Sequence, residues 1–162
     1  MIRKANAKDA KAIQELITPF AAKGEMLPKS LSDLYNQIRD FSVYEEDGVI
    51  VGTCALHVCW DDLAEIRSLA VQEGFRGKGV GKSLVKFCIK ETGGLEVTRI
   101  FALTYRREFF EKLGFVHVDK STLPHKIWVD CLKCVKFPDC DEEAMLLDLP
   151  GEISPGKKAR KA

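Results

Sequence analysis

Residues 64–92 constrain the fold of this chain more than any other stretch. They read AEIRSLAVQEGFRGKGVGKSLVKFCIKET. The apolar run that ends at Val71 has the length of a β-strand, and three glycines follow it at positions 77, 79 and 81. Beyond them, Val80, Leu84 and Cys88 recur at helical spacing, which predicts a helix with one apolar face. The stretch therefore predicts a strand that passes through a tight glycine turn into a helix.

The glycine turn has the features of a phosphate-binding site. Glycine has no Cβ, so the backbone of such a turn can approach a ligand closely. The free N–H groups in the first turn of the following helix then face the ligand, and the helix dipole favours negative charge there. The residues expected to hold a phosphate or pyrophosphate, including three cations, are Arg76, Gly77, Lys78, Gly79, Val80, Gly81 and Lys82.

The spacing of these glycines separates three classes of phosphate ligand. A dinucleotide fingerprint requires G-x-G-x-x-G, whereas this chain has G-x-G-x-G over 77–81. A nucleoside-triphosphate loop requires G-x-x-x-x-G-K-[ST], but Arg76 stands where its first glycine belongs. The pattern Arg76-x-x-Gly79-x-Gly81 instead resembles the pyrophosphate signature of the GNAT acyltransferases, R/Q-x-x-G-x-G/A, which bind acetyl-coenzyme A.

The composition is that of a single globular domain. The chain has 162 residues, of which 46% are apolar, and this is enough for a substantial core. A net charge of +1 gives no strong field that would attract nucleic acid, and no apolar run approaches the length of a membrane span. The N-terminus lacks the apolar core of a signal peptide. We therefore expect a cytoplasmic protein with reduced cysteines and with neither nucleic-acid nor membrane partners.

The rest of the chain alternates short apolar runs with helical patterns. Strands are expected at 2–5, 41–45, 49–60, 64–71, 97–103, 115–118 and 143–149. Helices are expected from Asn6 or Ala7 past Pro19, from Ser30 or Ser32 through Ile38, from Val80 to Gly93-Gly94, and over 106–113. Residues 119–140 are expected to be irregular, and the polar segment from Pro150 onward is expected not to order itself.

The resulting order, β-α-α-β-β-β-α-β-α-β-β, is that of the GNAT fold, and the resemblance covers about residues 2–149. The segment Phe109-Phe110-Glu111-Lys112-Leu113-Gly114-Phe115 strengthens it, because the family often closes its last helix with a Y-E-K-x-G-F-like turn. The resemblance implies an α+β (α/β) fold in which helices flank a mixed, mostly antiparallel central sheet. It also implies one domain over 1–149, followed by a disordered basic tail over 150–162.

Several stretches resemble more specifically the acetyltransferase domain of bacterial N-acetylglutamate synthase, which catalyses the first step of arginine synthesis. They are Ile2–Ala5 with Ile13–Pro19, Lys29-Ser30 before Leu34, Cys54–Leu56, Glu65 with Ala70-Val71, Phe101–Thr104, Phe109–Phe115, Leu123-Pro124 and Met145–Leu149. The resemblance implies acetyl transfer from acetyl-CoA to the α-amino group of L-glutamate. Larger members carry an arginine-binding amino-acid-kinase domain ahead of this one. This sequence has none there, so we expect no arginine inhibition through such a domain.

Acetyl transfer to an amine requires a base, because an α-amino group with a pKa of about 8 is mostly protonated at neutral pH. Glu65 is the candidate general base, since it lies on the strand that leads into the glycine turn. The resemblance points to the same residue, because the synthases keep a glutamate there. The alternative is an ordinary surface carboxylate at the start of a strand.

The thioester also has to be held and its sulfur released. As in GNAT proteins, the strand before the glycine turn is expected to offer main-chain groups to the pantetheine and an N–H to the oxyanion. The residues concerned are Leu69, Ala70 and Val71. Many GNAT enzymes place a tyrosine beside the departing sulfur, but Phe110 stands at that position here. Tyr105 or Thr104 can substitute, or both can be structural, because a thiol with a pKa of about 8.5 leaves fairly well unaided.

A glutamate acceptor requires positive groups for its two carboxylates. Arg67 lies two residues beyond Glu65, so the two side chains face the same side of a strand. Lys29 lies in the loop before the second helix, which shapes the acceptor site in GNAT folds. The candidate substrate-binding residues are Lys29, Arg67, Arg106, Lys126 and Lys133. For any single lysine, the alternative is a solvated surface charge.

A cysteine cluster near the C-terminus allows another interpretation. Cys131, Cys134 and Cys140 have C-x2-C-x5-C spacing, and thiolates at C-x-x-C spacing can share a zinc ion. A clear fourth ligand is missing, so we expect no metal and interpret the three as reduced cysteines in a loop, with a metal site and a redox-sensitive group as the alternatives. His57 and His117 alternate with apolar neighbours and are expected to be structural.

Three functions follow from these patterns. The first is acetylation of the α-amino group of glutamate by direct transfer from acetyl-CoA. The second keeps the fold but changes the acceptor to another amino acid, a polyamine or a protein N-terminus. The third is a non-catalytic CoA-binding or metal-sensing module in which residues 131–140 are the working part. The expected partner is a small-molecule substrate, and a homodimer is compatible with each function.

Overall fold

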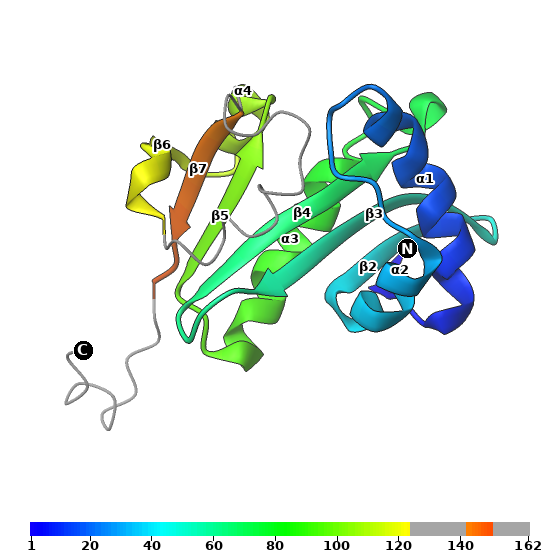
Figure 1. Cartoon of the computed structure of the whole chain (residues 1–162), viewed down its shortest axis with the longest axis horizontal. Helices are drawn as coiled ribbons and strands as arrows, with labels where there is room; N and C mark the ends of the chain where they lie inside the picture. Colours follow the sequence, from blue (N-terminus) through cyan, green and yellow to red (C-terminus); the bar gives the residue numbers. More distant parts are fainter. Residues whose placement is uncertain (124–141, 151–162) are drawn as a thin grey trace.

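The computed structural model describes residues 1–123 and 142–150. Its centre is a seven-stranded sheet with the order β1-β2-β3-β4-β5-β7-β6 (Figure 1). The strands are β1 (Ile2–Lys4), β2 (Phe41–Glu46), β3 (Val49–Val58), β4 (Leu63–Val71), β5 (Arg99–Thr104), β6 (Val116–Val118) and β7 (Glu143–Asp148). Neighbouring strands are antiparallel except β4 and β5, which are parallel. The predicted mixed, mostly antiparallel sheet is thus confirmed.

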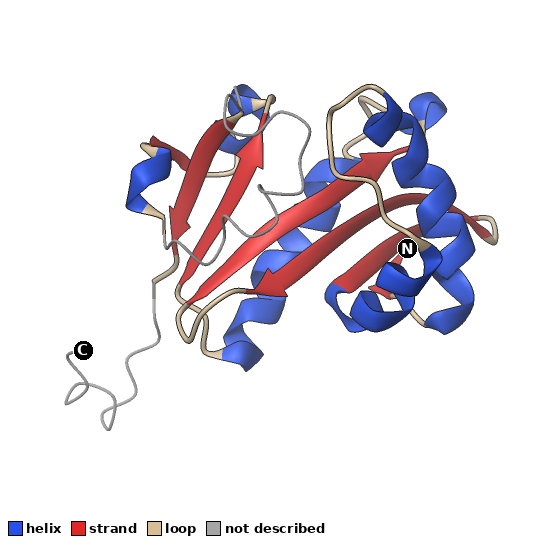
Figure 2. Cartoon of the chain, in the orientation of Figure 1, coloured by secondary structure: helices blue, strands red, loops and turns tan. Residues whose placement is uncertain are grey.

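Helices cover both faces of this sheet. They are α1 (Ala10–Ala22), α2 (Leu31–Gln37), α3 (Val80–Glu91) and α4 (Arg107–Glu111). In Figure 2, α1 and α2 lie on one face of β2–β4 and α3 lies on the other. Ile13, Ile17 and Leu34 form the core on the first face, whereas Leu84 and Cys88 belong to the core on the second. The apolar spacing read from the sequence therefore corresponds to buried helix faces.

The helix starts follow the predicted capping chemistry. The Asn6 side chain accepts a hydrogen bond from the Lys8 N–H and opens a 3₁₀ turn, η1 (Ala7–Asp9), that leads into α1. The Ser30 side chain accepts from the Asp33 N–H, and the Asp33 carboxylate accepts from the Ser30 N–H in return. This reciprocal capping box satisfies donors that have no partner within the helix. Of the two predicted caps for α2, Ser30 is confirmed.

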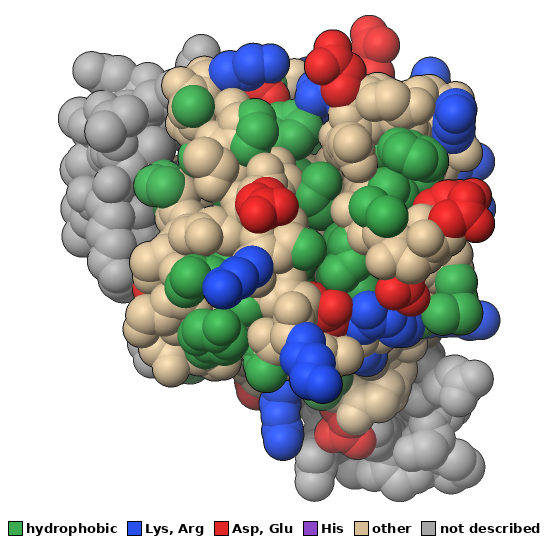
Figure 3. Space-filling model, turned by 90° about the vertical axis from the view of Figure 1, so that its right-hand side faces the viewer, with side chains coloured by type: hydrophobic (Ala, Val, Ile, Leu, Met, Phe, Trp, Pro, Cys, Tyr) green, Lys and Arg blue, Asp and Glu red, His purple; other side chains and the backbone are tan. Residues whose placement is uncertain are grey.

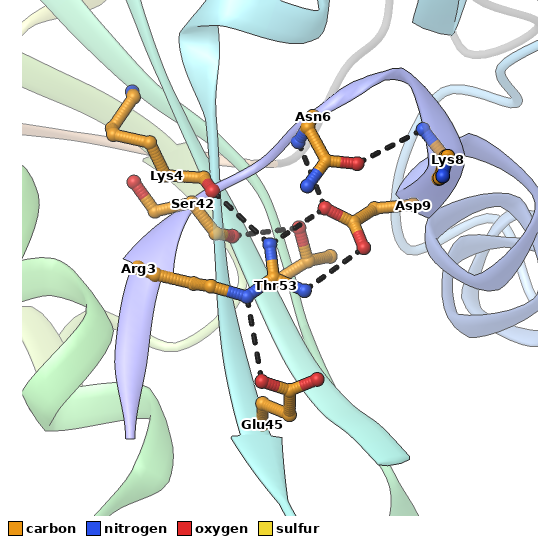
Figure 4. Close-up of polar contacts among 8 residues, drawn as sticks. All are labelled: Arg3, Lys4, Asn6, Lys8, Asp9, Ser42, Glu45 and Thr53. Atoms are coloured by element: carbon orange, nitrogen blue, oxygen red, sulfur yellow. Dashed lines mark hydrogen bonds and ion pairs between the residues drawn. The ribbon is translucent and has the colours of Figure 1, made fainter. Parts of the chain in front are cut away.

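An ion-pair cluster ties the first strand to the rest of the domain (Figure 4). The Arg3 guanidinium donates to both carboxylate oxygens of Asp9, at 2.8 and 3.0 Å, and its Nε lies 3.4 Å from Oε2 of Glu45. The Asn6 N–H also donates to Asp9, at 2.8 Å. The hydrogen bonds from Arg3, followed by that from Asn6, lower the pKa of Asp9. One buried carboxylate thus joins β1 and η1, and through Arg3 it joins them to β2.

The centre of the sheet opens between its two parallel strands. β4 and β5 pair over three positions only, and Glu65↔Phe101 is the last. Beyond it, the C-terminal half of β4 pairs only with β3 among the described strands. The β3–β4 register also shifts, because Thr53 pairs with Ala70 but Ala55 pairs with Arg67. This bulge places one extra residue in β4 at Ser68, which has a φ of +54°.

Some predicted boundaries are wrong by one or two residues. The strand expected at 49–60 ends at Val58, and the strand expected at 97–103 runs instead over Arg99–Thr104. The long helix ends at Glu91 and continues as a 3₁₀ turn, Thr92–Leu95, which contains both glycines. The predicted tail lies almost wholly beyond the described residues.

Among the described residues, no helix is long and apolar enough to cross a bilayer. Figure 3 shows positive and negative side chains interspersed on one face, as expected from the near-neutral sequence.

Candidate active site

A cavity of about 810 Å³ lies where β4 and β5 separate. β4, the glycine turn and the start of α3 form one side, and the end of β5 with α4 forms another. The C-terminal part of α1 and the loop before α2 complete it. The lining residues are Phe20, Glu25, Met26, Leu27, Lys29, Glu65, Ile66, Arg67, Ser68, Leu69, Val71, Phe75, Arg76, Gly77, Gly79, Val80, Gly81, Lys82, Ala102, Leu103, Thr104, Tyr105, Arg106, Phe109, Phe110 and Glu142.

The glycine turn forms the cationic end of this cavity. Gly77 and Gly79 have φ values of +76° and +81°, a region that favours glycine. Gly79 is the N-cap residue of α3 and has no side chain to occupy the free N–H groups of the first turn. These groups, the helix dipole and the lining side chains of Arg76 and Lys82 favour an anionic ligand. Six of the seven residues predicted to hold a phosphate therefore line the cavity, all but Lys78, and phosphate binding by them stays a prediction.

Two residues of the turn also contact aromatic rings. The Arg76 guanidinium carbon lies 5.0 Å from the centroid of Phe20, on α1. Nζ of Lys78 lies 5.3 Å from the centroid of Phe75, and Lys78 does not line the cavity. These contacts are within the range of cation–π interactions. The contact of Arg76 with Phe20 connects the turn with α1, which the sequence does not predict.

β4 presents different residues to the cavity before and after its bulge. Leu69 and Val71 line the cavity and pack against the core on the α3 face. Ala70 belongs instead to the core under α1 and does not line it. The bulge at Ser68 leaves backbone groups outside the regular ladder. Main-chain contact between this part of β4 and a ligand therefore remains a prediction, and the bulge supplies a physical basis for it.

Glu65 and Arg67 form an ion pair in the middle of the cavity wall. Oε1 of Glu65 lies 3.4 Å from Nε of Arg67, and the two side chains are only 16% and 14% exposed. Both line the cavity, and their contact agrees with the predicted placement on one side of β4. Glu65 pairs across the sheet with His57 of β3 and with Phe101 of β5. It therefore occupies the last position before the two parallel strands separate.

The end of β5 brings the other predicted groups to the cavity. Thr104, Tyr105 and Arg106 all line it, and the Thr104 hydroxyl accepts a hydrogen bond of 2.9 Å from the Arg106 N–H. Phe110 lines it as well and packs edge-to-face on Phe109, with ring centroids 5.1 Å apart. Phe110 is buried and has no proton to donate. Tyr105 and Thr104 therefore stay the predicted candidates for a general acid at this end.

Lys29 completes the opposite wall. Its Nζ donates to Oε1 of Gln37 on α2 at 3.2 Å, and its carbonyl oxygen accepts from Gln14 on α1 at 3.2 Å. These two contacts hold the loop before α2 against both N-terminal helices. Sequence reasoning missed the apolar residues beside it, including Phe20 and Met26. Their helical and loop patterns indicate core or surface, and no local signal shows that they face a ligand.

Several predicted residues lie outside the described ranges. They are Lys126, Lys133, Cys131, Cys134 and Cys140. Within residues 1–123 and 142–150, no group of His, Cys, Asp and Glu side chains could hold a metal ion. Cys54 and Cys88 are buried in the core, whereas Cys59 is only partly buried. A hydrogen bond to Cys88, together with burial, raises the pKa of the Cys54 thiol well above its usual value.

Comparison with known proteins identifies the family. The model of the acetyltransferase (GNAT) family matches residues 10–115, which span the glycine turn, both parallel strands and α4. The chain belongs to the GNAT acetyltransferase family. The resemblance inferred from the glycine spacing is therefore confirmed.

Proteins with similar sequences include other N-acetyltransferases, some of them named for amino acids. The chain is 40% identical over 148 residues to an uncharacterized N-acetyltransferase of Chlorobaculum tepidum, covering 91% of this chain and 96% of that protein. It is 34% identical over 131 residues to an amino-acid acetyltransferase of Mycobacterium tuberculosis, covering 79% of this chain and 75% of that protein. The suspected kinship with amino-acid acetyltransferases is thus supported.

Two solved structures extend the likeness to the fold. Rv2747 of Mycobacterium tuberculosis, in complex with CoA and NLQ, has a TM-score of 0.80 at 31% identity and covers 93% of this chain and 99% of that one. N-acetylglutamate synthase of Neisseria gonorrhoeae, complexed with coenzyme A and N-acetyl-glutamate, has a TM-score of 0.85 at 29% identity. The match covers 93% of this chain but only 35% of that synthase chain.

Proposed function

We propose that this GNAT protein transfers the acetyl group of acetyl-CoA to the α-amino group of L-glutamate, the first step of arginine synthesis. The observation that carries the proposal is the Glu65–Arg67 ion pair, which supplies a base and a cation at one point of the cavity. A relative 34% identical is named amino-acid acetyltransferase, and a similar structure binds coenzyme A and N-acetyl-glutamate. These likenesses favour an amino-acid acceptor.

Acetyl-CoA fits the shape and charge of the cavity. Its diphosphate would contact the N–H groups at the start of α3 and the side chains of Arg76 and Lys82. Its pantetheine would lie between β4 and β5, where the strands no longer pair with each other. The main chain of residues 69–71 would hydrogen-bond the amide groups of the pantetheine. This path brings the thioester to the part of the cavity wall that contains Glu65.

The chemistry follows from this placement. Glu65 takes a proton from the ammonium group of the acceptor, directly or through a water, so that the nitrogen gains a free lone pair. The amine attacks the thioester carbonyl, and a main-chain N–H near the β4 bulge stabilises the negative oxygen. The C–S bond then breaks, and the thiolate leaves with or without a proton from Tyr105 or Thr104. The products are CoA and an N-acetylated acceptor.

The acceptor carboxylates would be bound by cations around Glu65. Arg67 is the first candidate because its planar guanidinium can bind a carboxylate through two parallel hydrogen bonds. Lys29 and Arg106 line the cavity on other sides and can hold the second carboxylate. A dicarboxylic amino acid uses all of these charges, whereas a neutral amino acid would leave at least one without a counter-charge.

Thiol release across a panel of amino acids tests the proposal. Glutamate should give the highest kcat/KM, and glutamine should give less because it lacks the second negative charge. Glu65→Gln keeps the shape but removes the base, and it should lower kcat on the order of a hundredfold or more near neutral pH. Wild-type rates for this variant, at every pH, would contradict the assigned base.

An acceptor other than glutamate is the second candidate. The observation that favours it is the 40% identity to a Chlorobaculum tepidum N-acetyltransferase that is itself uncharacterized. The same panel should therefore include glutamine, other amino acids, polyamines and a peptide N-terminus. A preference for one of these over glutamate would replace the acceptor but keep the acetyl-CoA site and the role of Glu65.

A further inference from the structure

Beside the Glu65–Arg67 pair lies a second polar pair that the proposed function does not use. His57 of β3 is the direct cross-strand partner of Glu65. Directly opposed residues in antiparallel strands have their side chains on the same face, with Cβ atoms about 4.5–5.5 Å apart. Nδ1 of His57 lies 2.7 Å from Oδ2 of Asp40, which ends the 3₁₀ turn η2 (Ile38–Asp40) before β2. Asp40, His57 and Glu65 therefore succeed one another in a polar row, in which Asp40 contacts His57 directly and Glu65 lies opposite His57 in the strand register.

The contact with Asp40 defines the state of the His57 ring. An ionised carboxylate only accepts hydrogen bonds, so Nδ1 of the ring carries the proton and donates it to Asp40. Nε2 then has a lone pair that can accept a second proton. The carboxylate of Asp40 would stabilise the imidazolium formed in this way, as in other histidine–carboxylate pairs. The pair is thus oriented to receive a proton.

The exposed fractions of the side chains differ along this row. The Glu65 side chain is only 16% exposed, whereas that of His57 is 38% exposed. Asp40 of η2 contacts the ring, Glu65 of β4 lies opposite it in the register, and Arg67 contacts Glu65. The guanidinium of Arg67 favours the ionised form of Glu65. A proton on Glu65 is therefore driven outward, toward the more exposed ring.

We propose that His57, oriented by Asp40, carries the proton of the acceptor amine from Glu65 to solvent. This rests on the proposed function, in which Glu65 is the base. The N–H bond of the ammonium breaks as an O–H bond forms on Glu65. That O–H bond breaks in turn as Nε2 of His57 gains the proton, directly or across one water. The imidazolium then releases it to bulk water, so both side chains return to their starting states in every turnover.

His57 acts through Glu65 and is a positioning residue, so its test needs a readout that packing would not move. His57→Asn places an amide N–H close to the position of Nδ1 and keeps a donor for Asp40, but it has no basic nitrogen. We expect kcat to fall by about tenfold or more with KM for acetyl-CoA unchanged. The pH dependence of kcat should change, and added imidazole buffer should restore much of the rate.

The chain offers a matched control in His117. This residue of β6 also contacts a carboxylate, Glu143, and its side chain is also 38% exposed, but its cross-strand partner is Met145 instead of Glu65. His117→Gln keeps a donor near Nε2 and should leave both kcat and its pH profile unchanged. Thermal unfolding of the two variants shows whether either substitution perturbs the fold.

Each outcome decides between the possibilities. A His57→Asn variant with wild-type kcat and pH profile would overturn the relay. A loss that imidazole does not restore and that tracks a lower melting temperature would also overturn it, in favour of a structural role. Glu65→Gln separates the two proposals. A slow Glu65→Gln with a normal His57→Asn removes the relay alone, whereas wild-type rates for Glu65→Gln remove the base and the relay together.

Discussion

Glu65 combines a position in the strand pairing with a side-chain ion pair. It forms the third and last of the parallel pairs between β4 and β5. Its carboxylate also contacts Arg67, two residues further along β4. A carboxylate in such a place cannot be solvated as freely as one on the surface, so its charge depends on protein partners. The sequence predicts Glu65 as a base with Arg67 on the same side of its strand, whereas its cross-strand partners His57 and Phe101 come from the fold.

Asp9 is the residue whose contacts predict an effect on stability. Asp9→Asn removes the charge that holds Arg3, and it should lower the free energy of unfolding by about 1–3 kcal/mol near neutral pH. The folded-state pKa of Asp9 is lowered, so its contribution is present above the unfolded value of about 4 and is lost as pH falls through the folded pKa. Urea unfolding from neutral to acidic pH measures this.

The pH dependence provides the control for Asp9. The difference in unfolding free energy between wild type and Asp9→Asn should shrink as the solution becomes acidic, because Asp9 is then neutral in both states of the wild type. Asp119 is a matched comparison, since its pKa is also lowered but by hydrogen bonds from its neighbour Ser121 on the surface. Asp119→Asn should have a much smaller effect. A constant difference at all pH values would contradict the ion-pair explanation.

Elements were predicted well where a local signal defines them. The glycine turn, the Ser30 cap and the apolar faces of α1 and α3 are periodic or chemical patterns that act over a few residues. The bulge at Ser68 has no such signal, because a serine in an apolar strand is also compatible with regular pairing. Its position follows from the register that β3 imposes on β4. The bulge is therefore a tertiary feature.

The residues of the candidate site also divide into those that a local pattern predicts and those that only tertiary packing brings together. Residues on β4, in the glycine turn and at the end of β5 were found because they lie near one motif or match the family. Phe20 and Met26 were missed, since they reach the cavity only after α1 has packed against the sheet. His57 was interpreted as structural for the same reason. Its neighbours in the sequence are apolar, whereas its contact with Asp40 and its place opposite Glu65 arise only in the folded sheet.

The turn before α3 allows a test at the scale of an element. Gly79 has a positive φ, and a Cβ added there would meet no heavy atom within 4 Å. Gly79→Ala should therefore cost only backbone strain, roughly 1–2 kcal/mol. Relaxation of that strain would displace the first N–H groups of α3, so we expect KM for acetyl-CoA to rise several-fold while kcat changes little. Steady-state kinetics with varied acetyl-CoA measures this.

Gly48 is the matched control for that substitution. It lies in the turn between β2 and β3, has a φ of +78°, and also has open space where a Cβ would be added. Gly48→Ala should carry a similar strain without any effect on KM for acetyl-CoA. Equal changes in KM for the two variants would mean that the effect is a general loss of stability and that the turn does not hold the diphosphate.

At the scale of the whole molecule, the sheet consists of two parts joined over a short seam. β1–β4 with α1, α2 and α3 form one part, and β5–β7 with α4 form the other. β4 and β5 share only three paired positions, although α3 packs against residues of both parts. A pantetheine lying in the opening would contact both strands beyond the seam. Binding of acetyl-CoA should therefore stabilise the molecule as a whole as well as the glycine turn.

Thermal unfolding with and without acetyl-CoA tests this bridging. At a hundred times its dissociation constant, a ligand that binds only the folded state adds about 2.7 kcal/mol, which is roughly 5–10 °C in Tm for a domain of this size. Hydrogen exchange should slow in the second half of β4 and at the end of β5, where the two strands no longer pair with each other. Adenosine 3′,5′-bisphosphate, which lacks the pantetheine, should protect the glycine turn but not these strand ends. Equal protection by both ligands would mean that the opening between the strands does not bind the pantetheine.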